Sequence, residues 1–572
     1  MVYYVVITEV CHVPECNMLK ILSAYLKRIN SPFFRELVFI IICGIVGWQL
    51  SSIVYSTIYP GGEDRTKGNK AHQNKDFNSA VIYYTKAIEL DPTYARAYFG
   101  RGDTYSELKK YEEALADYTK AIELNSKYVA AYNNRGKTYS DLKKYEEALA
   151  DYTKAIELDP KDAYAYFNRG NTNKALEKIK ESLADYTKTI ELDPKYVNAY
   201  NNRGNTYCNL KKHEEAIADY TKAIELDPKY VFAYYGRGFT YGDLKKHPEA
   251  LADYTKAIEL DPKYVGAYNN RGFSYADLKK YPEALADYTK AIELDPKYVN
   301  AYNNRGNTYD ELKKHKEAIA DYSKAIELDP KEAEAYFNRG FTYGKLKKYE
   351  ETIADYTKAI ELDPKLAAAY NNRGHTYNNL KKYSEAMADC NKAIELEPKD
   401  ANSYDTRGGV YRNLKKYPEA ILDYTKAIEL DPNLAAAHNN RGFVFFDQQK
   451  YSDAEEDFTT AIKMYKTDDA AEPYFGRILS YFYLGKLSEA AADFEKTKDV
   501  IPKYADAFYY RGLVNHQFKK HQEAISDFNS AIEFNPKTAN TKYYAARGLA
   551  YKTLGKIKEA EADFAKAKEL EK

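Results

Sequence analysis

The sequence is poor in the residues that usually mark cofactor and disulfide chemistry. Five cysteines, one tryptophan and four methionines are scattered over 572 residues. An odd and dispersed set of cysteines predicts no disulfide framework. The paired Cys-x-x-Cys motifs that hold structural zinc are missing as well. We therefore expect neither a metal nor a cofactor.

An excess of charge of one sign is also missing. Lys and Arg together number 85, as do Asp and Glu, so the net charge is zero. General nucleic-acid binders carry a clustered basic excess, so we predict no nucleic-acid partner. The sequence has no P-loop, no H-E-x-x-H motif and no nucleophile elbow. We therefore predict that the protein is not an enzyme.

One long uncharged run follows the N-terminal segment 1–36 and covers residues 37–59. As a helix this run would span about 35 Å, which is enough to cross the hydrocarbon core of a bilayer, and Pro60 would end it. The favoured expectation is an uncleaved membrane anchor, and hence a single-pass membrane protein of undetermined orientation and compartment. A cleaved signal peptide and a buried or amphipathic helix of a globular part are the alternatives.

Tyrosine is abundant, with 60 residues, and it returns with a fixed period. The dipeptide Arg-Gly recurs every 34 residues from Arg101 to Arg441, and the same phase continues toward the C-terminus with two steps of 36 residues. Such self-similarity is typical of a repeat architecture, here covering residues 61–572. The fifteen predicted repeats begin at residues 61, 95, 129, 163, 197, 231, 265, 299, 333, 367, 401, 435, 471, 505 and 541.

Within a repeat, small and aromatic residues follow helical spacing. In the repeat at 129–162, positions 4, 8 and 11 hold Tyr132, Gly136 and Tyr139, which share one face of a predicted first helix. Positions 20, 24 and 27 hold alanine, tyrosine and alanine on one face of a second helix. Proline at position 32 ends that helix, because the residue before proline avoids the α region. Each repeat is thus a predicted helical hairpin that buries its apolar face by stacking on its neighbours.

This pattern resembles the tetratricopeptide repeat. The family has an aromatic residue at position 4, glycine at 8, tyrosine at 11, alanine at 20, an aromatic at 24, alanine at 27 and proline at 32, and most of the repeats match it nearly completely. The resemblance implies an all-α fold, a right-handed α-solenoid of about fifteen hairpins, whose concave groove binds other proteins or peptides. Position 7 departs from the family, because arginine stands where leucine is usual.

The arginine at position 7 is matched by an aspartate at position 23 in every repeat from the second to the fifteenth. In the first repeat both members change together, to Lys67 and Tyr83. Because unmatched charge is avoided near a core, we predict an ion pair between the two helices of each repeat. Three of the predicted structural pairs are Arg135 with Asp151, Arg203 with Asp219, and Arg271 with Asp287.

Positions 2, 5, 6, 9 and 13 of the first helix face away from the hairpin's own core, and in this family that face lines the inner groove. Position 6 is asparagine in eight repeats, and position 9 is phenylalanine in four. A carboxamide offers donors and an acceptor on one planar group, which suits a peptide backbone. The arrangement resembles the asparagine ladder in the repeat domain of O-GlcNAc transferase. The candidate groove residues are Asn134, Asn168, Asn202, Asn270, Asn304, Asn338, Asn372, Asn440, Phe239, Phe273, Phe341 and Phe443.

Two interpretations of these asparagines stay open: they bind an extended polypeptide, or they bond a neighbouring helix and tolerate solvent. For the whole chain we predict a membrane-tethered, non-enzymatic scaffold that binds polypeptide segments in its groove. The alternative is a regulatory or substrate-selecting subunit of a separate enzyme, such as a glycosyltransferase. Weak self-association through the last repeat is also expected, because repeat 15 leaves one helix face uncovered.

Overall fold

The computed structural model describes residues 61–465, 471–497, 505–534 and 541–570. Over these four ranges it contains thirty α-helices, α5 to α34, and no β-strand, so the predicted all-α solenoid is confirmed. The chain divides into an N-terminal body that ends at Leu278 and a C-terminal body that begins at Lys279. The division falls in the turn between the two helices of repeat 7, and each body is described by itself.

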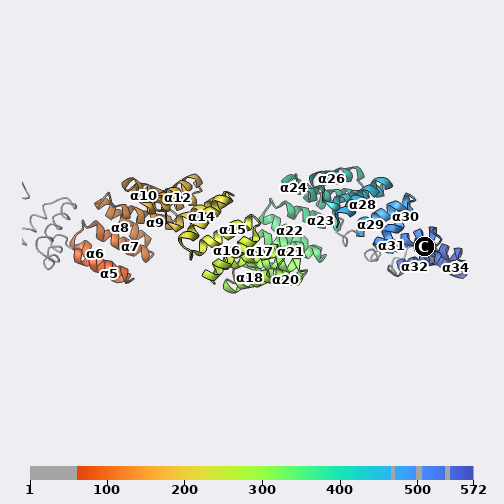
Figure 1. Ribbon diagram of the computed structural model, residues 1–572, viewed down its shortest axis with the longest axis horizontal. Coiled ribbons are helices and arrows are strands. Elements are labelled where there is room, and N and C mark those ends of the chain that lie inside the picture. The colour runs from red at the N-terminus through yellow and green to blue at the C-terminus, as the bar shows by residue number, and fades with distance from the viewer. Residues whose placement is uncertain (1–60, 466–470, 498–504, 535–540, 571–572) are drawn as a thin grey trace, which may run out of the picture. The chain divides into compact units, whose positions relative to one another are not determined.

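In the N-terminal body each complete repeat forms a first helix of 12 or 13 residues and a second of 14, and successive hairpins stack side by side (Figure 1). The helices are α5 (Gly62–Gln73), α6 (Phe77–Leu90), α7 (Ala95–Glu107), α8 (Tyr111–Leu124), α9 (Val129–Asp141), α10 (Tyr145–Leu158), α11 (Ala163–Ala175), α12 (Ile179–Leu192), α13 (Val197–Asn209), α14 (His213–Leu226), α15 (Val231–Asp243), α16 (His247–Leu260) and α17 (Val265–Asp277).

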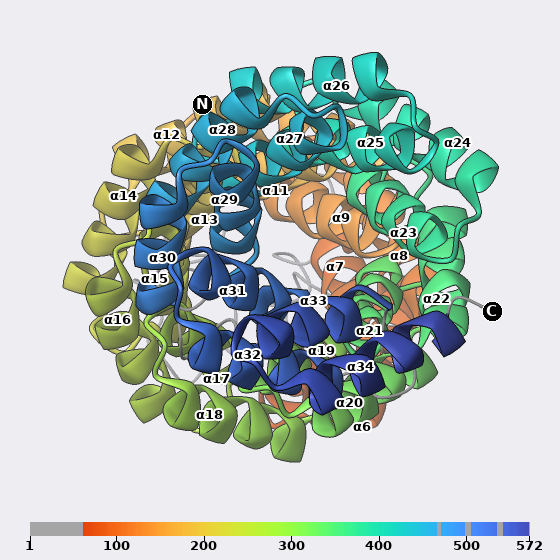
Figure 2. The same ribbon diagram turned by 90° about the vertical axis from the view of Figure 1, so that its right-hand side faces the viewer.

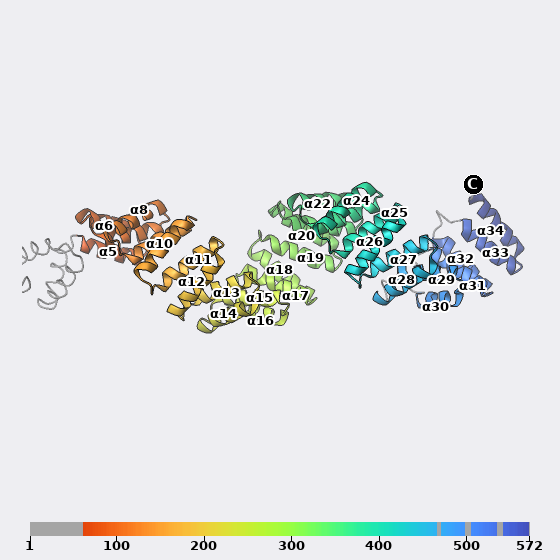
Figure 3. The same cartoon turned by 90° about the horizontal axis from the view of Figure 1, so that it is seen from above.

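The C-terminal body begins with the second helix of repeat 7 and continues the same alternation, with each hairpin packed on the next (Figure 3). Its helices are α18 (Tyr281–Leu294), α19 (Val299–Glu311), α20 (His315–Leu328), α21 (Ala333–Lys345), α22 (Tyr349–Leu362), α23 (Ala367–Asn379), α24 (Tyr383–Leu396), α25 (Ala401–Asn413), α26 (Tyr417–Leu430), α27 (Ala435–Asp447), α28 (Tyr451–Met464), α29 (Ala471–Tyr483), α30 (Leu487–Lys496), α31 (Ala505–Gln517), α32 (His521–Phe534), α33 (Thr541–Thr553) and α34 (Ile557–Leu570).

First helices lie on the inner side of each body. In the N-terminal body α9, α11 and α13 lie inside α12, α14 and α16, and in the C-terminal body α23 and α25 lie inside α24 and α26 (Figure 2). Consecutive first helices also contact one another directly, as α13 does α15, α23 does α25 and α27 does α29. The first helices therefore form the closely packed inner layer of each body. We call the face made by positions 2, 5, 6, 9 and 13 of these helices, which point away from their own hairpin, the inner surface.

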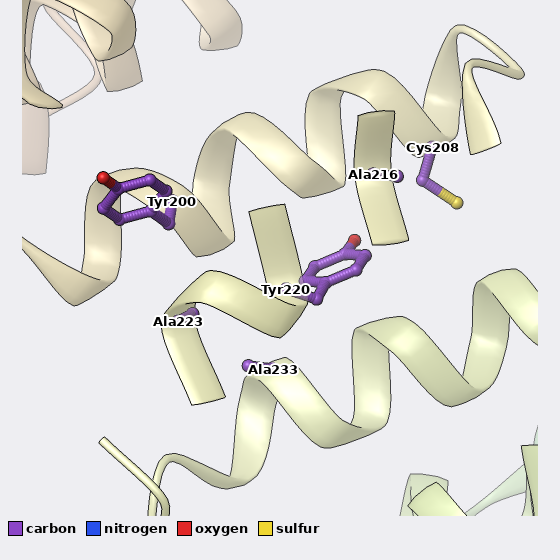
Figure 4. Close-up of a cluster of buried hydrophobic side chains, with 6 residues drawn as sticks. All are labelled: Tyr200, Cys208, Ala216, Tyr220, Ala223 and Ala233. Atoms are coloured by element: carbon purple, nitrogen blue, oxygen red, sulfur yellow. The ribbon is translucent and has the colours of Figure 1, made fainter. Parts of the chain in front are cut away.

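Most hairpins close around one glycine at position 8 and one aromatic ring at position 24; repeat 10 has Cys390 in place of the ring, and repeat 13 has Ile478 in place of the glycine. A Cβ atom added to Gly136 would lie 3.0 Å from the ring of Tyr152, and one added to Gly306 would lie 2.7 Å from the ring of Tyr322. Only glycine at position 8 therefore lets the two helices approach this closely around the ring. Figure 4 shows the result for Tyr220, which lies among the alanines of α14, Cys208 of α13 and Ala233 of α15.

The turn between the two helices carries backbone strain. Position 15 has a left-handed backbone in most repeats, with φ of 59° at Lys143, although lysine favours this region far less than glycine does. Repeats 13 and 15 carry glycine at the equivalent turn, Gly485 and Gly555, with φ of 73° and 75°. The chain thus contains both the strained and the relaxed version of one turn.

Replacing Lys143 by glycine is therefore expected to stabilise the protein. Removing the left-handed penalty gains roughly 1–2 kcal/mol, and the greater freedom of glycine in the unfolded chain takes back roughly 0.5–1 kcal/mol. Equilibrium unfolding of the full chain in urea should show a net gain of roughly 0.5–1 kcal/mol. The control is Lys144→Gly, where φ is −84° and only the loss applies. A K143G protein less stable than wild type would contradict the prediction.

The prediction of a single-pass membrane protein is corrected. In the parts of the chain that the structure describes, no helix is both long enough and apolar enough to cross a bilayer. The predicted membrane helix at 37–59 itself lies outside the described residues. A run of uncharged residues indicates that a span could form, and nothing in the described structure supports one.

Candidate functional site

The arginine at position 7 forms a bidentate ion pair with the aspartate at position 23. Arg135 donates from Nε and Nη2 to the two carboxylate oxygens of Asp151, at 2.8 and 2.7 Å. Arg203 binds Asp219 in the same way, with both distances 2.8 Å. Both aspartates are buried. The members of the third predicted pair, Arg271 and Asp287, belong to different bodies, and this pair stays a prediction.

The same arginine also ties its repeat to the preceding one. Nη1 of Arg135 donates to the Thr119 hydroxyl at 3.0 Å, and Nη1 of Arg407 donates to Oδ1 of Asn391 at 2.9 Å. Burial acts to lower the pKa of Arg135, but the hydrogen bond to Asp151 and the negative charge of Asp151, with smaller contributions from Tyr139 and Tyr132, together outweigh it and raise that pKa. Sequence reasoning missed this link, although the near-constant threonine at position 25 was its signal. Each of the three nitrogens of the Arg135 guanidinium thus already donates one hydrogen bond within the protein.

Four of the eight candidate asparagines donate to a side chain on the preceding first helix. The pairs are Asn134 with Asp103 (3.0 Å), Asn202 with Asn171 (2.9 Å), Asn270 with the Tyr235 hydroxyl (3.0 Å) and Asn440 with Asp405 (3.0 Å). Each bond joins two neighbouring repeats. For these four, one of the two N–H donors of the side-chain amide is used in the junction between repeats.

The other four asparagines do not share one arrangement. Asn168 donates to the backbone oxygen of Tyr164 at 3.0 Å, within its own helix. Asn372 accepts from its neighbour Asn371 at 3.5 Å. Nδ2 of Asn338 is buried without a hydrogen-bond partner, and a role for Asn304 stays a prediction. The row is therefore not a uniform ladder of outward-facing amides.

Asparagine at position 9 links the core to the inner surface. The buried tyrosine at position 24 donates its hydroxyl to this side chain at 2.7 Å, from Tyr186 to Asn171 and from Tyr322 to Asn307. Burial raises the pKa of Tyr186 to about 12, so its hydroxyl stays protonated and donates. Asn171 also accepts from Asn202, which extends the hydrogen-bonded chain into the next repeat.

Phenylalanine at position 9 presents apolar surface instead. Phe239 on α15 and Phe273 on α17 are 48% and 50% exposed, although both belong to the inner helices. Phe341 on α21 is also exposed, with Nζ of Lys345 at 4.6 Å from its ring centroid. Phe443 on α27 is half-buried, and the guanidinium carbon of Arg412 lies 5.1 Å from its ring centroid. Phe239 and Phe273 are therefore apolar side chains on packed helices whose exposed surface is not used by the core.

Two observations on the described residues concern metal and thiol chemistry. Among the described residues, no group of three or more His, Cys, Asp or Glu side chains is placed to hold a metal ion. Cys208 and Cys390 are buried free thiols. Burial raises the pKa of Cys390 to about 12, so its reactive thiolate form is scarce at neutral pH.

Comparison with protein families identifies the repeat. A family model described as Tetratricopeptide repeat matches residues 95–128, 129–162, 197–230, 231–264, 265–298, 333–366 and 367–400. Further tetratricopeptide models match 68–109, 151–184, 171–211, 287–320, 306–347, 408–449, 439–500, 475–539 and 541–572. The chain belongs to the tetratricopeptide repeat family. Repeats of this kind stack into solenoids with extended binding surfaces.

Several solved structures resemble the chain at low sequence identity. One chain in the crystal structure of the APC/C hetero-tetramer Cut9–Hcn1 is 16% identical to this chain. The match covers 85% of this chain and 96% of that chain, with a TM-score of 0.47. Yeast Tom70 is 19% identical over 77% and 99%, with a TM-score of 0.36. A tetratricopeptide repeat protein from Parabacteroides merdae is 22% identical over 44% and 98%, also at 0.36. No curated protein matches the chain significantly.

Proposed function

We propose that this tetratricopeptide protein is a non-enzymatic scaffold that binds extended polypeptide segments along its inner surface. Membership of the family supports a protein–protein interaction scaffold. The observation that carries the finer proposal is the pair of half-exposed rings, Phe239 and Phe273, on consecutive first helices of the N-terminal body. Rings held on packed helices offer apolar contact to a partner with little further loss of conformational freedom.

The asparagines have a supporting role in this proposal. Because the amides of Asn202 and Asn270 bond across repeat junctions, they set the spacing of the inner surface more than they donate to a bound chain. The likeness to the asparagine ladder of O-GlcNAc transferase is therefore limited to the position of these residues. The predicted weak self-association through the last repeat is not supported and forms no part of the proposal.

The test is a selection of linear peptides from a random phage-displayed library on the full chain, followed by fluorescence anisotropy of the selected peptides. A hot-spot side chain contributes more than about 1 kcal/mol, so Phe239→Ser with Phe273→Ser should weaken binding by about tenfold or more. The control is Ile82→Ser, because Ile82 is 56% exposed on the second helix α6. Equal weakening by both variants, or no selected peptide at all, would refute the proposal.

A further inference from the structure

Repeat 11 breaks the pattern of the inner surface at two positions of the C-terminal body. Position 5 is Asp405, whereas every other repeat from the second to the fifteenth has asparagine, phenylalanine, tyrosine or alanine there. Position 9 is Gly409, between His375 and Phe443 in the neighbouring repeats. Residues four apart share one face of a helix, so a carboxylate and a missing side chain lie together on α25.

The space over Gly409 is open. A Cβ atom added there would meet only Nδ2 of Asn378 at 3.5 Å and the Tyr424 hydroxyl at 3.7 Å. These are ordinary contact distances, whereas a Cβ on the adjacent Gly408 would lie 2.8 Å from the Tyr424 ring. Gly408 is thus required by the core, and Gly409 is not. Its missing side chain leaves room on the inner surface, bordered by an amide and a hydroxyl.

The carboxylate of Asp405 has few polar partners in the described part of the chain. It accepts one hydrogen bond, from Nδ2 of Asn440 at 3.0 Å. The other carboxylates whose charges reach Tyr424 are Asp423 and Asp447, and each has its own arginine. These ion pairs are Asp423 with Arg407 at 2.7 Å and Asp447 with Arg412 at 3.0 Å.

Within the described ranges no Lys, Arg or His side chain forms an ion pair with Asp405. Burial raises the pKa of this carboxyl to about 6, and the bond from Asn440 opposes the rise only in part. A carboxylate that is half-buried and has no cation beside it is unfavourable. One negative charge on the inner surface is therefore left for a cation from outside the chain.

We propose that Asp405 and the space over Gly409 form a subsite for a basic side chain, lysine or arginine, of a polypeptide bound on the inner surface of the C-terminal body. The proposal rests on the proposed function and names the chemistry of one partner residue. The ammonium or guanidinium group supplies the missing positive charge, and the Tyr424 hydroxyl and Asn378 amide lie beside it. Arg412 does not fill this place, because it pairs with Asp447 and covers the ring of Phe443.

The test uses peptides selected on the full chain and on an Asp405→Asn variant, which keeps the shape and removes the charge. Peptides from the wild-type selection should share a lysine or arginine at one position. Changing that residue to norleucine or citrulline should weaken binding to wild type about tenfold or more and binding to D405N by less than twofold. The matched control is Asp310→Asn, because the buried Asp310 already pairs with Lys345 at 2.7 Å; it should behave as wild type.

The outcomes separate the two proposals. If wild type and D405N select peptides with the same preference for basic residues, the subsite is refuted and the scaffold function stands. The same holds if the selected peptides share no basic residue. If no peptide binds either protein, the proposed function fails, and the subsite fails with it.

Discussion

Replacing Asp151 by alanine is expected to destabilise the N-terminal body by about 3–5 kcal/mol. The change leaves the guanidinium of Arg135, which is 17% exposed, without the two hydrogen bonds that neutralise it. Only the bond to Thr119 would remain. Because each repeat is stabilised by its neighbours, the loss should spread to the adjacent hairpins. Urea unfolding of the full chain and hydrogen exchange of α9 and α10 would measure it.

Two further variants show whether the loss comes from the stranded charge. Glu147→Ala removes an exposed acid from the same helix α10 and should change stability by less than about 0.5 kcal/mol. Adding Arg135→Leu to D151A should restore part of the stability, since removing both members of a buried pair leaves no unpaired charge. If D151A unfolds at the same urea concentration as wild type, the pair does not stabilise the fold.

The helical hairpins could be predicted because the same pattern of small and aromatic residues recurs in fifteen consecutive repeats. Glycine at position 8 and the aromatic at position 24 recur in phase, so one repeat read as two helices settles the others. The pair at positions 7 and 23 was detectable for a related reason. Both members change together in repeat 1, and a buried charge needs a partner.

The contacts between repeats could not be predicted from one helix alone. The helical period shows that Asn202 faces away from its own hairpin, but not that Asn171 of the preceding repeat lies 2.9 Å away. That distance depends on how closely the backbones approach around the glycine and the ring. The same applies to Thr119, whose hydroxyl accepts from Arg135. The sequence alone is therefore compatible with asparagines at position 6 that are free to bind a partner, whereas in the structure several of them bond one repeat to the next.

Asp405 shows both what the repeated pattern reveals and what depends on contacts between repeats. Its departure from the pattern of position 5 is visible in the sequence, and so is the glycine four residues later. Their significance is not, because it depends on the hydrogen bond from Asn440 and on the open space over Gly409. A single irregular repeat in a regular array is informative once its neighbours are known in three dimensions.

Asp405→Asn is expected to stabilise the unliganded chain at neutral pH by roughly 2 kcal/mol. The pKa of Asp405 is raised from 3.8 to about 6 in the folded protein, and each tenfold change in proton affinity corresponds to about 1.4 kcal/mol. We expect less than the full effect because the side chain is only half-buried. An acid with a raised pKa binds its proton more tightly when folded. Wild-type stability therefore falls as the pH rises from about 4 through 6.

The asparagine variant lacks this titration, so the difference between D405N and wild type should be absent near pH 4 and complete by pH 7. Urea unfolding at a series of pH values measures it. Asp310→Asn provides the opposite sign. Burial acts to raise the pKa of Asp310, but the hydrogen bonds with Lys345, His315 and Thr342 and the positive charge of Lys345 together outweigh it and lower that pKa. D310N should therefore lose stability at neutral pH, and the loss should disappear in acid.

A more stable D405N that no longer prefers basic peptides would show that this carboxylate weakens the free fold and strengthens a complex. A residue with only a structural role should not do both, because its removal would leave ligand preference unchanged. If D405N is instead less stable than wild type at pH 7, the charge is already compensated within the chain. Repeat 11 would then need no cation from a partner, whatever the peptides contain.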